Sequence, residues 1–293
     1  MANTKFSVAM AVYKNDKPEQ LSIALDSICT QSYPPSEIYL VIDGPIGSEL
    51  QNVIDEYTNK YDYFMINQLE KNSGLGNALR VAVENCKYDL IARMDSDDIS
   101  APGRFKKQIE AYESEPADVI GGWTIGFSGD VENGPVTCSK RPLEHQAIIK
   151  RLSKRSPMSH VTVLFKRDAV LRVGNYIDLY YHEDYYLWAR MIANGATFRN
   201  LPEYLVYVRV GVDQARRHGG IKYFSAEKYL RKYMLKHHLI KTQEYITSMA
   251  IRVVYQLLIT PAMRNFLADR LKRVYITRED ADQILKRNLD TDV

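Results

Sequence analysis

The chain has 293 residues, of which 45% are hydrophobic and 26% charged, and its mean hydropathy is −0.33. This composition is typical of a globular protein and allows one large domain, with or without a smaller appendage. It contains no run of the roughly 18 uncharged apolar residues that a membrane-spanning helix needs. Three widely spaced cysteines, Cys29, Cys86 and Cys138, indicate neither a disulfide framework nor a zinc cluster.

The charge is divided unevenly along the chain. Residues 1–215 carry 23 Lys and Arg against 28 Asp and Glu, whereas residues 216–293 carry 16 against 8. A basic C-terminal region suits an anionic partner, such as a phospholipid surface, a pyrophosphate or a nucleic acid, but it is also typical of a solvated helical surface. The chain starts without a signal-peptide pattern, and together with the few cysteines this predicts a cytoplasmic protein.

The first hundred residues alternate apolar, β-branched runs with helical patterns. Strands are predicted at Phe6–Val12, Ile38–Ile42, Phe64–Leu69 and Leu90–Met94, and helices between them at Pro18–Gln31, Glu49–Lys60 and Leu75–Cys86. Such alternation indicates a parallel, doubly wound α/β sheet covered by helices. Ligands of these sheets gather at the carboxyl ends of the strands, where Asp43 and Asp95 are expected.

The pattern changes after residue 100, and we expect the remainder of the domain to complete the same sheet and to build the second wall of a cleft. The predicted helices are Pro102–Ser114, Leu143–Leu152 and Glu183–Ala193, and the predicted strands are Val119–Phe127, Val161–Lys166, Phe198–Leu201 and Tyr204–Val210. From about Ile221 the chain has an all-helical pattern. We therefore expect a catalytic domain at 1–220, with a nucleotide half at about 1–100 and an acceptor half at about 101–220, followed by a basic helical extension at 221–293.

Three carboxylates, Asp95, Asp97 and Asp98, follow the fourth predicted strand. Carboxylates this close repel one another unless a cation neutralises them, and oxygen ligands suit Mg²⁺ or Mn²⁺, which commonly hold a diphosphate as well. An Asp-x-Asp pair by itself is equally typical of a turn that caps a following helix. The neighbouring motifs favour the metal site.

Five segments, in order, make the chain resemble glycosyltransferase family 2, whose members adopt the GT-A fold. They are Ser7–Tyr13, Val41–Gly44, Asn72–Ala78, Arg93–Asp98 and His182–Arg190. Four further stretches resemble bacterial exopolysaccharide and O-antigen transferases of the amylovoran type: Ala92–Ser100, Arg104–Gln108, Ser159–Val163 and Arg216–Gly220. The resemblance implies a mostly parallel central sheet flanked by helices, a UDP-sugar donor, and an acceptor such as GlcNAc on an undecaprenyl diphosphate carrier.

The resemblance also implies roles for individual residues. Donor binding falls to Tyr13, Asp43, Asn72, Gly74, Asp95 and Arg216, and metal binding to Asp97 with Asp95 and, as a third ligand, His218. Asp184 would be the catalytic base of an inverting transfer, although acidic residues are also common in a first helical turn. Glu183, His160 and Trp188 are acceptor candidates, and for Trp188 a place in the core is the better expectation.

Other functions remain open at this point. A nucleotidyltransferase also uses metal-bound aspartates, but it needs a glycine-rich loop after the first strand, and Val12 to Asp16 contain no glycine. A nucleic-acid-binding protein would explain the basic extension but not the acidic cluster, so no nucleic-acid partner is expected. The apolar faces of the extension suit peripheral contact with a membrane, packing on the catalytic domain, or a homo-oligomer.

Overall fold

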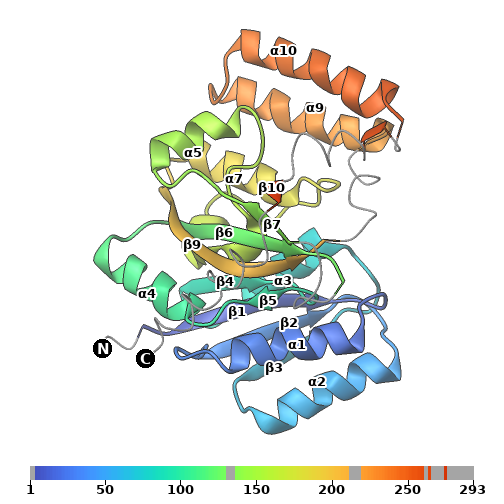
Figure 1. Ribbon diagram of the computed structural model, residues 1–293, viewed down its shortest axis with the longest axis vertical. Helices are drawn as coiled ribbons and strands as arrows, with labels where there is room; N and C mark the ends of the chain where they lie inside the picture. The colour runs from blue at the N-terminus through green and yellow to red at the C-terminus, as the bar shows by residue number, and fades with distance from the viewer. Residues whose placement is uncertain (1–3, 130–135, 211–218, 261–262, 265–273, 276–293) are drawn as a thin grey trace.

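The first half of the chain alternates strands and helices as the sequence predicts (Figure 1). The computed structural model describes residues 4–129, 136–210, 219–260, 263–264 and 274–275. Its elements begin with β1 (Phe6–Val12), α1 (Pro18–Cys29), β2 (Glu37–Ile42), α2 (Ser48–Lys60), β3 (Phe64–Gln68), α3 (Leu75–Asn85) and β4 (Leu90–Met94). The strands pair in parallel in the order β3-β2-β1-β4, which brings their carboxyl ends to one edge of the sheet.

The second half enlarges this sheet and makes it mixed. Its elements are β5 (Ile99–Ser100), α4 (Arg104–Ser114), β6 (Val119–Phe127), β7 (Val136–Ser139), α5 (His145–Leu152), the 3-10 turn η1 (His160–Thr162), β8 (Leu164–Lys166), α6 (Arg167–Leu171), α7 (Glu183–Ala193) and β9 (Phe198–Arg209). Strand β8 lies antiparallel between β4 and β6, while β9 pairs in parallel with β6 and antiparallel with β5. The two strands predicted at 198–210 are one strand, with register shifts opposite Trp123.

Helices cover both faces of the sheet. Along β1, Phe6, Val8, Met10 and Val12 pack against α1, α2 and α4, whereas Ala9 faces the opposite side. That opposite side is filled by α3, α6, α7 and α9. Successive side chains of a strand point to opposite faces, so a strand covered on both sides is mostly apolar, as β1 is apart from Ser7, whose hydroxyl donates to Glu37.

The C-terminal region is helical, with α9 (Ile221–Lys236), α10 (Thr242–Arg252) and the π-helical turn η2 (Val253–Leu258). Leu230 and Met234 of α9 belong to the same core as α3 and α7, so α9 has no separate core of its own. The expectation of an all-helical region is wrong at β10 (Val274–Tyr275), because this short strand pairs antiparallel with β7. Among the described residues no helix is both long enough and apolar enough to span a bilayer.

Two buried side chains of α4 brace the end of β4. The Arg104 guanidinium donates to the carbonyl oxygens of Arg93 and Val161 at 2.8 and 3.0 Å, and Gln108 donates to those of Ile120 and Thr162 at 3.1 and 2.9 Å. Burial and the nearby Arg93 charge lower the pKa of Arg104 to about 9. The stretch Arg104–Gln108, one of the four that resemble the amylovoran-type transferases, therefore has a structural role, which is to hold β4 against β6 and η1.

Candidate functional site

Tyr13, Asp43 and Asp95 each follow directly after a parallel strand, and so they share the carboxyl edge of the sheet. The backbone N–H of Asp43 donates to the carbonyl oxygen of Val12 at 2.8 Å, which joins the ends of β1 and β2. Tyr13 is 39% exposed at this edge. The structure therefore gathers three of the predicted donor residues at one place, as the strand assignments required.

Asp43 organises the loop that contains Asn72 and Gly74. Its carboxylate accepts from Asn72 Nδ2 at 3.0 Å, from the backbone N–H and the hydroxyl of Ser73 at 2.7 and 3.0 Å, and from the Gly74 N–H at 3.0 Å. Gly44 allows this close approach, because its φ is +87° and a Cβ there would lie 2.5 Å from the Asn72 nitrogen. An ionised carboxylate has about four acceptor positions. The loop thus occupies the acceptor positions of the Asp43 carboxylate, and a hydrogen bond from a donor base would have to replace one of these contacts.

The acidic cluster consists of Asp95, Asp97 and Asp98, each of which places a carboxylate oxygen within 4.8 Å of the others. Burial, followed by the charges of the neighbouring aspartates, raises the pKa of Asp97 and of Asp98. A divalent cation would remove this repulsion, and an all-oxygen donor set suits Mg²⁺ or Mn²⁺. The residues present therefore fit a divalent metal site.

Arginines from two strands hold the cluster in place. Arg93 of β4 donates to both carboxylate oxygens of Asp95, through Nη1 at 2.6 Å and through Nη2. At the end of β9, the Arg209 N–H donates to Asp98 Oδ1 at 2.8 Å and its Nε donates to the Asp97 carbonyl oxygen at 3.2 Å. Arg209 was not predicted as a site residue, since it lies more than a hundred residues further along the chain.

Asp16 is a fourth acidic residue beside the cluster that the sequence analysis missed. Its carboxylate accepts from Ser96 Oγ at 2.8 Å and from the Tyr13 N–H at 3.0 Å. Burial, together with the charges of Asp97 and Asp95, raises its pKa to about 6. The sequence did contain a signal for Asp16: it lies just beyond the end of β1, and that end shares an edge of the sheet with the end of β4.

Helix α7 brings Glu183 against the first turn of α3 and Asp184 against Ser156. A Cβ added to Gly76 would lie 3.4 Å from the Glu183 Cβ, so this glycine allows α3 to approach α7. Ser156 Oγ donates to Asp184 Oδ2 at 3.4 Å. Burial raises the pKa of both carboxyl groups, and with the Asp184 charge it brings that of Glu183 to about 7.

Arg93 links the acidic cluster to α7 electrostatically. It is 3% exposed and pairs with Asp95. Burial raises the pKa of Asp97, Glu183 and Asp184, and the Arg93 charge opposes that rise in all three. A single buried charge acts on both groups only if they lie near the same place. This shared electrostatic influence supports one site for the cluster and for α7.

Of two acceptor candidates, Trp188 is fully buried and His160 is half-buried. Trp188 is 0% exposed, with its ring edge-on to those of His160 and Phe198 at centroid distances of 6.0 and 5.9 Å. This burial contradicts a role as a sugar platform and places Trp188 in the core. His160 Nε2 lies 2.8 Å from the Tyr176 hydroxyl, and burial, aided by the Arg93 charge, lowers the His160 pKa. His160 therefore packs on the buried Trp188 and bonds to Tyr176 rather than standing free.

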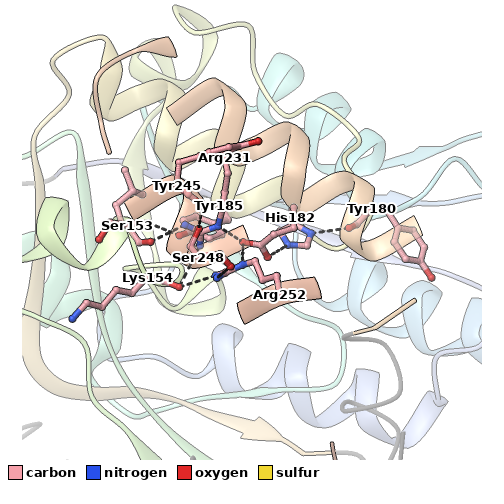
Figure 2. Close-up of polar contacts among 11 residues, drawn as sticks. Ser153, Lys154, Tyr180, His182, Tyr185, Arg231, Tyr245, Ser248 and Arg252 are labelled. Carbon is pink, nitrogen blue, oxygen red and sulfur yellow. Dashed lines mark hydrogen bonds and ion pairs between the residues drawn. The ribbon is translucent and has the colours of Figure 1, made fainter. Parts of the chain in front are cut away.

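His182, which precedes the α7 carboxylates, is held by the C-terminal helices (Figure 2). Its Nε2 lies 2.9 Å from the Glu227 carboxylate of α9, and its Nδ1 lies 2.9 Å from the Tyr180 carbonyl oxygen. Glu227 also accepts from Arg231 Nε at 2.7 Å, and it forms an ion pair with Arg252, whose Nε lies 2.6 Å from the carboxylate. One buried carboxylate thus connects α9, α10 and the start of α7.

The same arginines hold the segment that follows α5. Arg231 Nη1 donates to the Ser153 carbonyl oxygen at 2.7 Å, and Arg252 Nη2 donates to that of Lys154 at 3.0 Å (Figure 2). Ser156, which contacts Asp184, lies two residues beyond. The helices α9 and α10 therefore support Asp184 in two ways: through His182, two residues before it, and through the segment that contains Ser156. Arg216 and His218, predicted for donor and metal binding, lie outside the described residues.

Comparison with a solved structure identifies the fold. The fold is that of a GT-A glycosyltransferase, since the chain superposes on residues 1–349 of S. aureus TarS in complex with UDP-GlcNAc with a TM-score of 0.67 and 16% identity. The match covers 99% of this chain and 80% of that chain.

The chain belongs to glycosyl transferase family 2, whose domain matches residues 7–174. Among its relatives, the UDP-Gal:alpha-D-GlcNAc-diphosphoundecaprenol beta-1,3-galactosyltransferase of Escherichia coli is 35% identical over 93% of this chain and 98% of its own length. The amylovoran biosynthesis glycosyltransferase AmsE of Erwinia amylovora is 38% identical over 81% and 87% of the two chains. The predicted family and activity class are confirmed: the protein is a glycosyltransferase. This removes the nucleotidyltransferase and nucleic-acid-binding alternatives.

Proposed function

We propose that the enzyme moves a hexose from a UDP-sugar to GlcNAc carried on a lipid diphosphate, with inversion at the anomeric carbon. The observation that supports the proposal is the position of Arg93, which pairs with Asp95 and whose charge also opposes the rise in the pKa of Glu183 and of Asp184. A donor diphosphate held at the acidic cluster would then lie close to a buried carboxylate on α7. The acceptor is the one in the name of the Escherichia coli relative, whose donor is UDP-Gal.

The donor half of the site would lie at the carboxyl edge of the sheet. Asp97 and Asp95 would hold Mn²⁺ or Mg²⁺, with Asp98 supporting them from its buried position. When bound, the metal would stabilise the negative charge that builds on the departing UDP. Tyr13 and the Asn72–Gly74 loop, held in shape by Asp43, would contact the nucleotide.

Asp184 would act as the base. It would take the proton of the acceptor hydroxyl while that oxygen bonds to the anomeric carbon, and the bond from this carbon to the diphosphate oxygen would break on the opposite face. UDP would leave with the bonding electron pair. A well-placed base contributes roughly 10²–10⁴-fold to such a step. Glu183, with its pKa near 7, would orient the acceptor beside it.

The acceptor lipid places the proposed reaction at a membrane, and α10 with η2 offers a surface for it. Ile246, Val254 and Leu258 are 61, 50 and 71% exposed, and they recur at a helical spacing of eight and four residues. The opposite side of these elements carries the buried polar residues Ser248 and Gln256. A helix with its apolar side outward beside a basic surface suits adsorption to an anionic bilayer.

The test of the donor site is a melting experiment with UDP and Mn²⁺, alone and together. A ligand at 100 times its Kd stabilises the folded state by about 2.7 kcal/mol. UDP with Mn²⁺ should raise the melting temperature more than the separate effects of UDP and Mn²⁺ combined. The absence of any such synergy would refute the metal-assisted donor site. A panel of UDP-sugars with a synthetic GlcNAc-diphosphate-lipid would then identify the transferred sugar.

A further inference from the structure

Three arginines near Asp184 have no carboxylate partner among the described residues: Arg151 and Arg155 precede Ser156, whose hydroxyl contacts Asp184, and the charges of both, with that of Asp184, act on the pKa of Arg141. Arg141 lies in the connection between β7 and α5, Arg151 lies in the last turn of α5, and Arg155 lies one turn beyond it. The Arg155 N–H donates to the Arg151 carbonyl oxygen at 3.1 Å, so the helical turn continues and the two side chains emerge on the same side. No ion pair within 4.0 Å involves any of the three arginines in the part of the chain that the structure describes.

This grouping is costly to the protein as it stands. Burial and then the charges of Arg151 and Arg155 lower the pKa of Arg141 to about 10. The Nε atoms of Arg141 and Arg151 are buried and have no hydrogen-bond partner. A buried donor left unpaired costs about 1–3 kcal/mol, and more when the group is charged. An anion that bound here would relieve both the repulsion and the missing bonds.

The C-terminus of a helix attracts basic side chains, which offers a simpler reason for Arg151 and Arg155. That reason does not extend to Arg141, because this residue lies outside the helix and four residues before its start. Arg141 is anchored by a bond from its Nη1 to Ser139 Oγ at 2.9 Å and by a bond from Trp123 Nε1 to its carbonyl oxygen at 3.0 Å. Its position is therefore fixed by the sheet.

The three arginines lie on the acceptor side of the site. The charge that raises the Arg141 pKa is that of Asp184, not that of the Asp95–Asp98 cluster. Ser156, which contacts Asp184, directly follows Arg155. The backbone between Arg151 and Ser156 is fixed by Arg231 and Arg252, so these side chains extend from a preformed segment.

We propose that Arg141, Arg151 and Arg155 form the subsite for the diphosphate of the lipid-linked acceptor. The inference rests on the proposed function, in which the acceptor hydroxyl lies at Asp184 and one sugar ring separates it from the diphosphate. Arginine suits this ligand because its planar guanidinium forms paired, charge-assisted bonds to phosphate oxygens. The acceptor diphosphate and the donor diphosphate would then occupy separate cationic sites on the two sides of Asp184.

The test compares two acceptors that share one alkyl chain, GlcNAc-diphosphate-alkyl and GlcNAc-alkyl without the diphosphate. For Arg151→Gln and Arg155→Gln, kcat/KM with the diphosphate acceptor should fall about 10- to 100-fold, the size of one or two lost charge-assisted bonds. The fall with the simple glycoside should be much smaller. Lys150→Gln is the matched control, since it removes the same charge from an exposed neighbouring position.

Three other outcomes would overturn the subsite. An equal loss with both acceptors would assign the arginines a structural role, and a weaker UDP affinity in Mn²⁺ would assign them to the donor diphosphate. A loss matched by Lys150→Gln would indicate general attraction to anions. Equilibrium binding of GlcNAc-diphosphate-alkyl to these variants gives the same comparison without turnover. If the wild type binds this ligand through the arginines but transfers nothing to it, the proposed function fails and the subsite stands.

Discussion

His182 and Glu227 form a buried pair across 45 residues of sequence, with 2.9 Å between Nε2 and the carboxylate. Their side chains are 3 and 5% exposed. His182 precedes the proposed base by two residues, while Glu227 belongs to α9, which the sequence assigned to a separate extension. The pair therefore makes the C-terminal helices part of the support for the catalytic helix α7.

Removal of Glu227 should be strongly destabilising. Glu227→Ala would leave Arg231, Arg252 and His182 without the carboxylate that all three pair with, and breaking a buried pair in this way costs about 3–5 kcal/mol. Urea denaturation of the variant and the wild type measures the difference. Glu244→Gln changes an exposed carboxylate of α10 and should cost at most about 1 kcal/mol. Equal stability of Glu227→Ala and the wild type would contradict a structural role for the pair.

The contribution of the pair should depend on pH in a defined window. Burial lowers the pKa of His182, but the hydrogen bond to Glu227 and the Glu227 charge outweigh burial and leave the pKa above 6.5. The contribution of His182 to stability is therefore complete below pH 6.5 and is lost as the pH rises. Burial raises the pKa of Glu227, but His182, Arg252 and Arg231 outweigh burial and leave the pKa below 4.5. The contribution of Glu227 to stability is therefore complete above pH 4.5 and is lost in acid. The stability difference between the wild type and Glu227→Gln should therefore be largest between pH 4.5 and 6.5. A difference that stays constant from pH 4 to 9 would argue against this linkage.

Asp97→Ala should abolish the metal-dependent part of UDP binding. The substitution removes one of three carboxylates that lie within 4.8 Å of one another, and with it a ligand of the proposed metal. Calorimetric titration of UDP with and without Mn²⁺ measures the effect. Asp62→Asn, at an exposed position far from the cluster in the sequence, should bind as the wild type does. Unchanged UDP affinity of Asp97→Ala in Mn²⁺ would exclude Asp97 as a ligand.

Asp184→Asn should retain UDP binding and lose transfer by roughly 10²–10⁴-fold, because only the proton acceptor is removed. Burial raises the pKa of Asp184 above 3.8, and the base must be ionised, so kcat of the wild type should fall in acid around a pKa above that value. Ser156→Ala removes a bond to the ionised form and should move this acid limb higher still. Ser153→Ala is the matched control. Near-normal turnover of Asp184→Asn would remove Asp184 as the base.

Leu258→Asp should weaken adsorption to anionic vesicles. Leu258 is 71% exposed on η2, so the substitution should affect the fold little while removing one apolar side chain worth about 1.5–3 kcal/mol when buried. Co-sedimentation with phosphatidylglycerol vesicles should show a loss of about tenfold or more. Ser225→Asp introduces the same charge at an exposed position of α9 and should bind nearly as well as the wild type. Equal losses in both variants would indicate charge repulsion alone.

The sequence by itself determined the α/β class, the bounds of most early elements and the family. The apolar runs at Phe6–Val12 and Leu90–Met94 located β1 and β4 to the residue, because strands covered on both faces are mostly apolar, with only Ser7 and Arg93 as polar exceptions here. The strand ends placed Asp43 and Asp95 at one edge, and five short motifs in order indicated a family that the comparison confirmed. Local patterns suffice where neighbouring residues decide the structure.

Only the tertiary structure decided how distant residues meet. The pairing of β10 with β7, the bonds of Arg209 to the acidic cluster and the pair of His182 with Glu227 join segments far apart in sequence. Periodicity contains no information about such partners, because they are chosen by packing and charge compensation after the chain has folded back on itself. For the same reason Asp43 was predicted beside the donor but not as the residue whose carboxylate shapes the Asn72–Gly74 loop.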